Sequence, residues 1–296
     1  MKKELSKRKI ITITSLSVVA ISIGTGLGIF FGQEFLGPRT DYDAYDLNYY
    51  EDDIGDLYNR YQSSSNPLVD FKPYELVNVA YHEFEKLTSN YVVTDGDINA
   101  SIINQTLCSV SIKNDGMYFN ESISSSSMVQ VAKRFYQEDG LVTTYDGHNI
   151  IEGKMATWTE ENKTIENLND YEEVWGKTLS RSSIYIVSSK TVLNSTIEEV
   201  DDGYLVSIDL DPITSVLRYV KQMAKMSNLS RKPQFDKVHM EVKLDNNMQL
   251  IERVVNESYT VYMMGAHQSN ATILDKYYQN QIDIPALDDN FEYGGI

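Results

Sequence analysis

Five Asp-Gly dipeptides, each flanked by residues typical of β-strands, constrain the fold of this chain more than any other feature. They lie at 95–96, 115–116, 139–140, 146–147 and 202–203. Asp-Gly supplies the positive φ angles that tight hairpin turns require. Five such turns predict a meandering antiparallel sheet.

Alternating apolar residues place strands between and after these turns. Six apolar residues share one parity and predict a strand with one buried face: Ile98, Ala100, Ile102, Cys108, Val110 and Ile112. Cys108 belongs to this parity, so we interpret it as a small core residue rather than a nucleophile. Further strands are expected at 182–187, 204–210, 235–244, 248–264 and 271–278.

Helices are expected at three places, so the predicted fold class is α+β. Pro73 fits the first turn of a helix over 73–88, and a short helix is expected at 167–175. Asp211 and Pro212 predict the start of an amphipathic helix over 211–226. This helix either packs on its own sheet or docks on a membrane or a partner. Its apolar stripe contains Ile213, Val216, Leu217, Val220, Met223 and Ala224.

The N-terminal end has the pattern of a membrane anchor. Residues 10–32 carry no charge and are long enough to cross a bilayer as a helix, and the basic residues precede them in 1–9. We expect a single-pass signal anchor in the cell membrane, with a cytoplasmic N-terminus and an extracellular remainder. A long, cleaved signal peptide is the alternative. Gly24, Gly28 and Gly32 repeat every four residues, which either favours packing into a homodimer or reflects ordinary membrane-helix composition.

Residues 33–70 differ in composition from the rest of the chain, being acidic and rich in tyrosine. We interpret them as a solvated stalk and linker, with a weak cation or partner site as the sharper alternative. An extracytoplasmic domain then follows at 71–281, with a C-terminal tail at 282–296.

Composition excludes several function classes. The chain has 26 Lys and Arg against 43 Asp and Glu, a net charge of −17, which argues against binding nucleic acid. A lone cysteine excludes an intrachain disulfide, and the four histidines are not at metal-ligand spacing. Neither a G-x-S-x-G nucleophile elbow nor a G-x-x-x-x-G-K-[ST] phosphate loop occurs in the sequence. We therefore expect no catalytic residues, no metal and no cofactor.

Two local patterns and the order of elements suggest a resemblance. Tyr145-Asp146-Gly147-His148 is expected between two strands, and a strand-turn-strand is expected from Val238 to Val255. In these respects the chain resembles the bacterial lipoprotein-carrier superfamily, of the LolA and LppX type. The resemblance implies a curved half-barrel with helices over its mouth and a cavity for acyl chains or another apolar ligand. The lipidated cysteine of that family is absent, and a helix would replace it as the anchor.

That resemblance implies candidate lining residues for such a cavity. They are Val220, Met223, Met240 and Met263, although ordinary core packing explains the same side chains. The leading hypothesis is non-catalytic binding of a lipid or other apolar ligand. The alternative is an interaction or regulatory ectodomain that contacts an envelope partner. A carrier needs a continuous apolar void under the helix at 211–226, whereas an interaction module needs a filled core and an exposed apolar patch.

Overall fold

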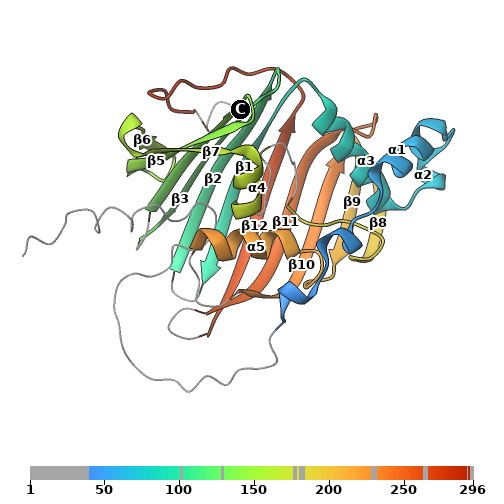
Figure 1. Ribbon diagram of the computed structural model, residues 1–296. Helices are drawn as coiled ribbons and strands as arrows, with labels where there is room; N and C mark the ends of the chain where they lie inside the picture. The colour runs from blue at the N-terminus through green and yellow to red at the C-terminus, as the bar shows by residue number, and fades with distance from the viewer. Residues whose placement is uncertain are drawn as a thin grey trace, which may run out of the picture.

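One open antiparallel sheet with helices gathered on one face dominates the fold (Figure 1). The predicted α+β class with an antiparallel sheet is confirmed. The expected anchor at 10–32, with Gly24, Gly28 and Gly32, lies outside the residues that the computed structural model describes. Those residues are 40–100, 103–127, 130–175, 179, 184–227, 232–262, 266–291 and 293.

The sheet consists of two meanders that meet in its middle. In the described part of the chain its order is β6-β5-β4-β3-β2-β1-β12-β11-β10-β9-β8, with β7 also paired to β5. β1 and β12 join the halves through a register that runs from Tyr91↔Tyr278 to Ala100↔Ser269. The N-terminal half contains β1 Ser89–Ala100, β2 Ile103–Asn114, β3 Met117–Ser126, β4 Gln130–Glu138, β5 Leu141–Ile151, β6 Met155–Thr157 and β7 Lys163–Asn167. The C-terminal half contains β8 Val192–Val200, β9 Gly203–Leu210, β10 Gln234–Leu244, β11 Leu250–Tyr262 and β12 Ala266–Tyr278.

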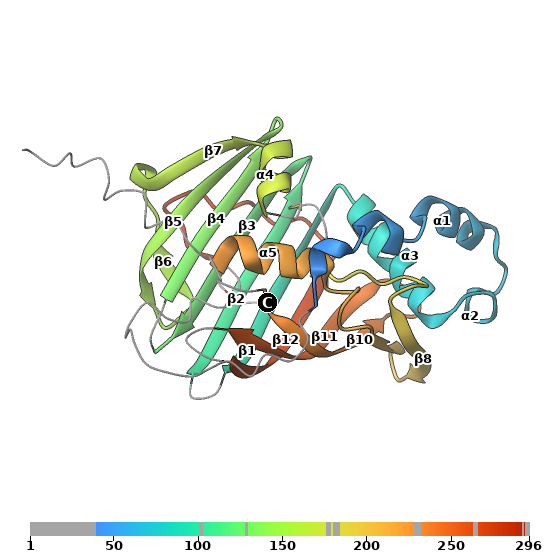
Figure 2. The same cartoon turned by 60° about the horizontal axis from the view of Figure 1, so that its bottom comes forward.

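The three longer helices over the sheet, α3, α4 and α5, lie on the same face, which we call the helix face (Figures 1 and 2). The opposite face is crossed by residues 282–291 and 293, which we call the strap, so we name it the strap face. The helical segments are η2 Tyr42–Ala44, η3 Leu47–Tyr50, α1 Ile54–Ser63, α2 Pro67–Asp70, α3 Pro73–Lys86, η4 Glu160–Asn162, α4 Leu168–Trp175 and α5 Leu217–Ser227.

Three of the five predicted Asp-Gly turns are present. Asp115-Gly116 and Asp139-Gly140 have positive φ and close the hairpins after β2 and β4, and Gly203 follows the turn after β8. The prediction was wrong for the other two, which lie inside β1 and β5. At Gly147 a side chain would meet the Trp158 ring at 2.8 Å, so this glycine is needed for close packing rather than for a turn.

The long strand expected from Ile98 to Ile112 is instead the β1–β2 hairpin. Ile98 pairs with Gln105, and Asp95 pairs with Cys108. Opposed residues of an antiparallel pair share a face, so Ile98 and Cys108 point to opposite faces despite their common parity. Cys108 is nevertheless buried, as predicted.

The other expected elements are largely present, with two corrections. Helix α5 begins at Leu217 rather than at 211, because the Asp211 carboxylate accepts hydrogen bonds from the amides of Ile213 and Thr214 and stabilises a preceding turn. No strand forms over residues 184–187 of the strand expected at 182–187. Tyr145-Asp146-Gly147-His148 lies within β5 rather than between strands.

The expected stalk and tail both pack against the sheet domain where the structure describes them. Tyr42 is buried in the core of the C-terminal half, and Leu57 is buried against α3 and Phe71. Asp52 accepts a hydrogen bond from the Ser189 amide at 2.7 Å. Residues 40–70 therefore form part of the folded unit rather than a solvated spacer, because their tyrosines and leucine supply apolar contacts that the acidic composition obscures.

Candidate ligand-binding face

The helix face of the C-terminal half is an apolar, filled core. Val220 and Met223 of α5 and Met240 of β10 are each at most 1% exposed and pack in one cluster with α3. Met263 lies outside the described residues. The side chains of α5 that the structure describes therefore cover core atoms rather than a continuous apolar void. Their sheet neighbours are Val206, Ile208, Leu210, Val238, Val242 and Val255.

The helix face of the N-terminal half is covered too, but it is mostly polar, apart from an apolar cluster that contains Phe135 and Val142. We call this surface the polar floor. Its register follows directly from the strand pairing: Ser109 opposes Ser122, which opposes Lys133, which opposes Asp146. The polar floor consists of Gln105, Ser109, Asn120, Ser122, Ser124, Lys133, Thr144 and Asp146, all of them buried except Asp146, which is half-buried.

Some polar-floor groups are paired with each other. Lys133 Nζ lies 2.5 Å from Asp146 Oδ1, and the lysine side chain is only 3% exposed. Asn120 Nδ2 donates to Ser109 Oγ at 3.3 Å and to the Val110 carbonyl at 3.2 Å. These contacts hold the floor in one arrangement and present both signs of charge on it.

Two hydroxyls of the polar floor have no hydrogen-bond partner among the residues that the structure describes. They are Ser122 Oγ and Thr144 Oγ1, both buried. A buried hydroxyl without a partner costs roughly 1–3 kcal/mol, and such groups in a native fold call for an explanation. Their position on one covered face favours a polar partner that the protein itself does not supply.

Helix α5 connects the two halves of the helix face. Figures 1 and 2 both show it crossing the sheet from the side of β11 and β12 toward β2–β4. Helix α4 lies over the N-terminal half, where Tyr171 packs on Phe135 and Val142. The polar floor thus lies on the face of the sheet that carries α4 and α5.

A separate small cavity opens at the edge of the C-terminal half. Its volume is about 170 Å³, and it lies between η3, α1, α3, the loop 184–187 and the start of α5. Its charged residues are already engaged: Arg218 pairs with Glu51, and Asp52 binds the loop at Ser189. Burial lowers the pKa of Arg218 to about 10. These pairings join the helices and the loop around the cavity, so we interpret it as a gap between packed elements.

Beneath that cavity lies a buried network on β11. Glu257 accepts hydrogen bonds from the hydroxyls of Tyr185, at 2.8 Å, and Tyr219, at 3.4 Å. Burial raises the pKa of Glu257 to about 7. Arg253, two positions away along the same face of β11, is bound instead to Asp275 at 2.7 Å. The network fastens α5 and the 184–187 loop to the sheet.

Two potential nucleophiles of the sheet, Ser122 and Cys108, are not activated in this structure. Ser122 has no hydrogen-bonded base, and burial raises the pKa of Cys108 to about 11. Neither side chain is therefore an activated nucleophile. Among the described residues, no group of three or more His, Cys, Asp or Glu is placed to hold a metal ion.

The sequence reasoning missed the polar floor for a specific reason. In β2 and β3 the serines alternate with apolar residues such as Val110 and Ile123, a pattern that predicts one buried and one solvated face. The structure buries both faces, and in β3 all residues from Phe119 to Ser124 are buried. The signal available in the sequence was the small size of the polar residues, which leaves room for a covering layer.

Comparisons with known proteins give no relationship that assigns a function. No family profile and no curated protein matches the chain. The ywiB protein from Bacillus subtilis aligns over 64% of this chain and 91% of its own, at 10% identity and a TM-score of 0.20. A DUF1329 family protein from Desulfovibrio piger aligns over 72% of this chain and 93% of its own, at 11% identity and a TM-score of 0.21. Similarities this low carry no argument about fold or function.

Proposed function

We propose that this protein is a non-catalytic binding protein whose helix face takes the polar head group of a lipid-class ligand. The observation that carries the proposal is the pair of buried hydroxyls, Ser122 and Thr144, that have no partner within the described part of the chain. A ligand head group lying on the polar floor would supply their hydrogen bonds.

The chemistry of the polar floor favours a particular head group. Lys133 and Asp146 place one positive and one negative charge side by side. Serine, threonine, asparagine and glutamine side chains supply both donors and acceptors. A neutral, hydroxyl-rich or zwitterionic head group is complementary to this set. A wholly apolar ligand is not, because the apolar region beneath the described part of α5 is filled.

The predicted anchor fits this function. A single-pass helix at 10–32 would hold the folded unit outside the cell membrane and close to a supply of lipids. Within the described residues, no helix is long and apolar enough to span a membrane. We include in the same proposal the lipoprotein-carrier resemblance and the placement at the membrane. A homodimer through Gly24, Gly28 and Gly32 is also part of it.

The alternative, an interaction ectodomain, is favoured by one specific surface. Leu141, Ile151, Met155 and Ile165 are each 40–57% exposed, and all lie on β5, β6 and β7. These strands form one edge of the sheet, and an exposed apolar edge is a common site of strand addition. An envelope partner would then dock at this edge.

Native mass spectrometry of the full chain, released from a lipid-free detergent, tests the proposal. We expect a stoichiometric adduct that organic extraction identifies as a lipid and that Ser122→Ala with Thr144→Val removes. Thr143→Val is the matched control, because Thr143 lies next to Thr144 on the opposite face and should leave the adduct in place. A bare mass that takes up no added lipid would refute ligand binding and favour the interaction ectodomain.

A further inference from the structure

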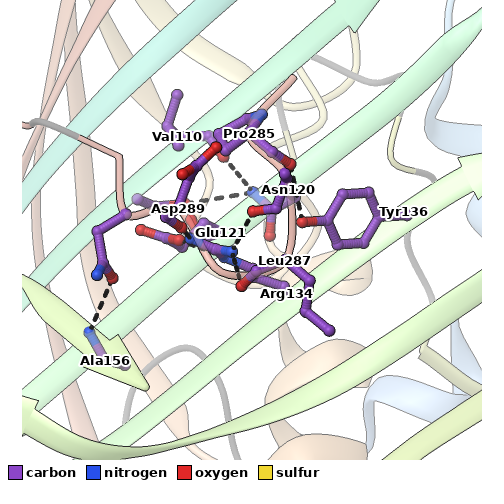
Figure 3. Close-up of polar contacts among 12 residues, drawn as sticks. Val110, Asn120, Glu121, Arg134, Tyr136, Ala156, Pro285, Leu287 and Asp289 are labelled. Atoms are coloured by element: carbon purple, nitrogen blue, oxygen red, sulfur yellow. Dashed lines mark hydrogen bonds and ion pairs between the residues drawn. The ribbon is translucent and has the colours of Figure 1, made fainter. Parts of the chain in front are cut away.

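The strap crosses the strap face of the N-terminal half, and the side chain of Arg134 makes several of the hydrogen bonds that hold it there (Figure 3). Arg134 of β4 is fully buried. Its Nη1 donates to the carbonyls of Ala286, at 3.1 Å, and Leu287, at 3.0 Å, and its Nη2 donates to the carbonyl of Asp289. A guanidinium has five donors in a fixed plane, which suits it to gather several carbonyls.

The arginine is itself held in position by the sheet. Its Nε donates to Glu121 Oε2 at 2.6 Å, and its guanidinium lies 4.4 Å from the Trp158 ring centre. Glu121 is fully buried and also accepts a hydrogen bond from the Tyr293 hydroxyl of the strap at 2.8 Å. The buried ion pair between Arg134 and Glu121 belongs to the sheet, and the strap forms hydrogen bonds with both of its members.

Other contacts extend this recognition along the strap. Tyr136 donates its hydroxyl to the Pro285 carbonyl at 3.1 Å, and the Ala156 amide donates to Asn290 Oδ1 at 3.3 Å. Phe291 is buried in the apolar cluster of β1–β3, and Tyr293 packs against it.

The strap is bound as a ligand peptide would be bound. Its main-chain carbonyls accept hydrogen bonds from the side chains of Arg134, Tyr136 and Asn114, and its described residues are not a strand of the sheet. Hydrogen bonds to main-chain carbonyls do not depend on the side chains of the bound segment. The apolar contacts of Phe291 and Tyr293 do depend on them. This division is typical of peptide recognition.

We infer that the strap face of β1–β5 is a binding surface for an extended polypeptide, and that the strap is its resident occupant. The partner must present consecutive main-chain carbonyls to Arg134 and an aromatic side chain at the position of Phe291. When the strap leaves, water can reach Arg134 and Glu121. Replacing the strap by another segment therefore does not require a buried charge without a partner at any stage. This surface is distinct from the polar floor, which lies on the opposite face.

The test uses the full chain with a loosened strap. Phe291→Ala with Tyr293→Ala changes only the strap and leaves the surface beneath it intact. A fluorescent peptide of sequence 281–296 is titrated into the loosened chain and into the wild type, and fluorescence anisotropy reports binding. Hydrogen exchange of the strap amides shows whether the strap has been released.

We expect the peptide to bind the loosened chain at least tenfold more tightly than the wild type, and Tyr136→Phe or Arg134→Lys to weaken that binding. Tyr136→Phe removes one hydroxyl only and serves if the arginine variant fails to fold. A dimer of the loosened chain that Tyr136→Phe weakens would identify the strap of a second copy as a partner. Unchanged strap exchange in the loosened chain, or a released strap with no peptide binding, would overturn the inference.

Discussion

The two halves of this sheet bury their faces with opposite chemistry. The C-terminal half covers a mostly apolar helix face with α3 and α5 and leaves polar residues such as His239 and Glu241 on its other face. The N-terminal half buries most of its apolar side chains under the strap, apart from Phe135 and Val142 beneath α4, and keeps polar ones on the helix face. Function in this fold is therefore best sought where a face is covered but polar, because core packing alone does not require that arrangement.

The largest expected effect tests the apolar half of this comparison. Val220→Asp places a carboxylate in the filled core beneath α5, and we expect it to lower the free energy of unfolding by about 3–5 kcal/mol. Lys221→Asp, at the exposed neighbouring position, is the control and should change it by less than about 0.5 kcal/mol. Thermal unfolding that is near normal for Val220→Asp would show that α5 does not pack on this core.

The network that fastens α5 should make stability depend on pH. The folded chain keeps the Glu257 proton up to about pH 7, whereas the unfolded chain loses it near the ordinary carboxyl value. The free energy of unfolding should therefore fall as pH rises from about 4.5 to 7, by on the order of 3 kcal/mol. Glu257→Gln should remove much of this slope in chemical denaturation across that range.

Glu252→Gln provides the matched control for this pH dependence. Glu252 lies on the same strand but on the opposite, partly exposed face. Its replacement should leave the slope unchanged. Equal slopes in wild type and Glu257→Gln would show that Glu257 is not the buried group that titrates.

A smaller effect tests the packing on the strap face of the N-terminal half. Gly147→Ala would place a methyl group against Trp158, and we expect it to lower the free energy of unfolding by about 1–3 kcal/mol. Denaturant unfolding measures this loss. Combining it with Trp158→Leu should cost less than the sum of the single changes, because the smaller side chain makes room. Strict additivity would place Trp158 away from Gly147.

The smallest effect on stability is expected on the polar floor. Ser122→Ala and Thr144→Val remove hydroxyls that have no protein partner, so each should leave the unfolding free energy unchanged or raise it by up to about 1 kcal/mol. Differential scanning calorimetry of the ligand-free chain measures this change. A loss of 2 kcal/mol or more would mean that these hydroxyls stabilise the fold itself.

Local signals in the sequence predicted the elements well but not the faces. Pro73 marked the start of α3, and Asp115-Gly116 marked a true hairpin turn, because both act through backbone geometry that is local. Gly147 could not be read in the same way, since its role depends on Trp158 from another strand. The strap and the polar floor could not be predicted in this way. They depend on which distant segments cover each face of the sheet, and the sequence of a single strand does not show this.

A crystal structure of the wild-type chain at a resolution that shows bound molecules would test the division of the helix face most directly. We predict density for a ligand head group or ordered water within about 3.2 Å of both Ser122 Oγ and Thr144 Oγ1, and none between Val220 and Met240. Protein atoms bonded to both hydroxyls, or a molecule bound beneath Val220 instead, would contradict the assignment of the polar floor as the binding site.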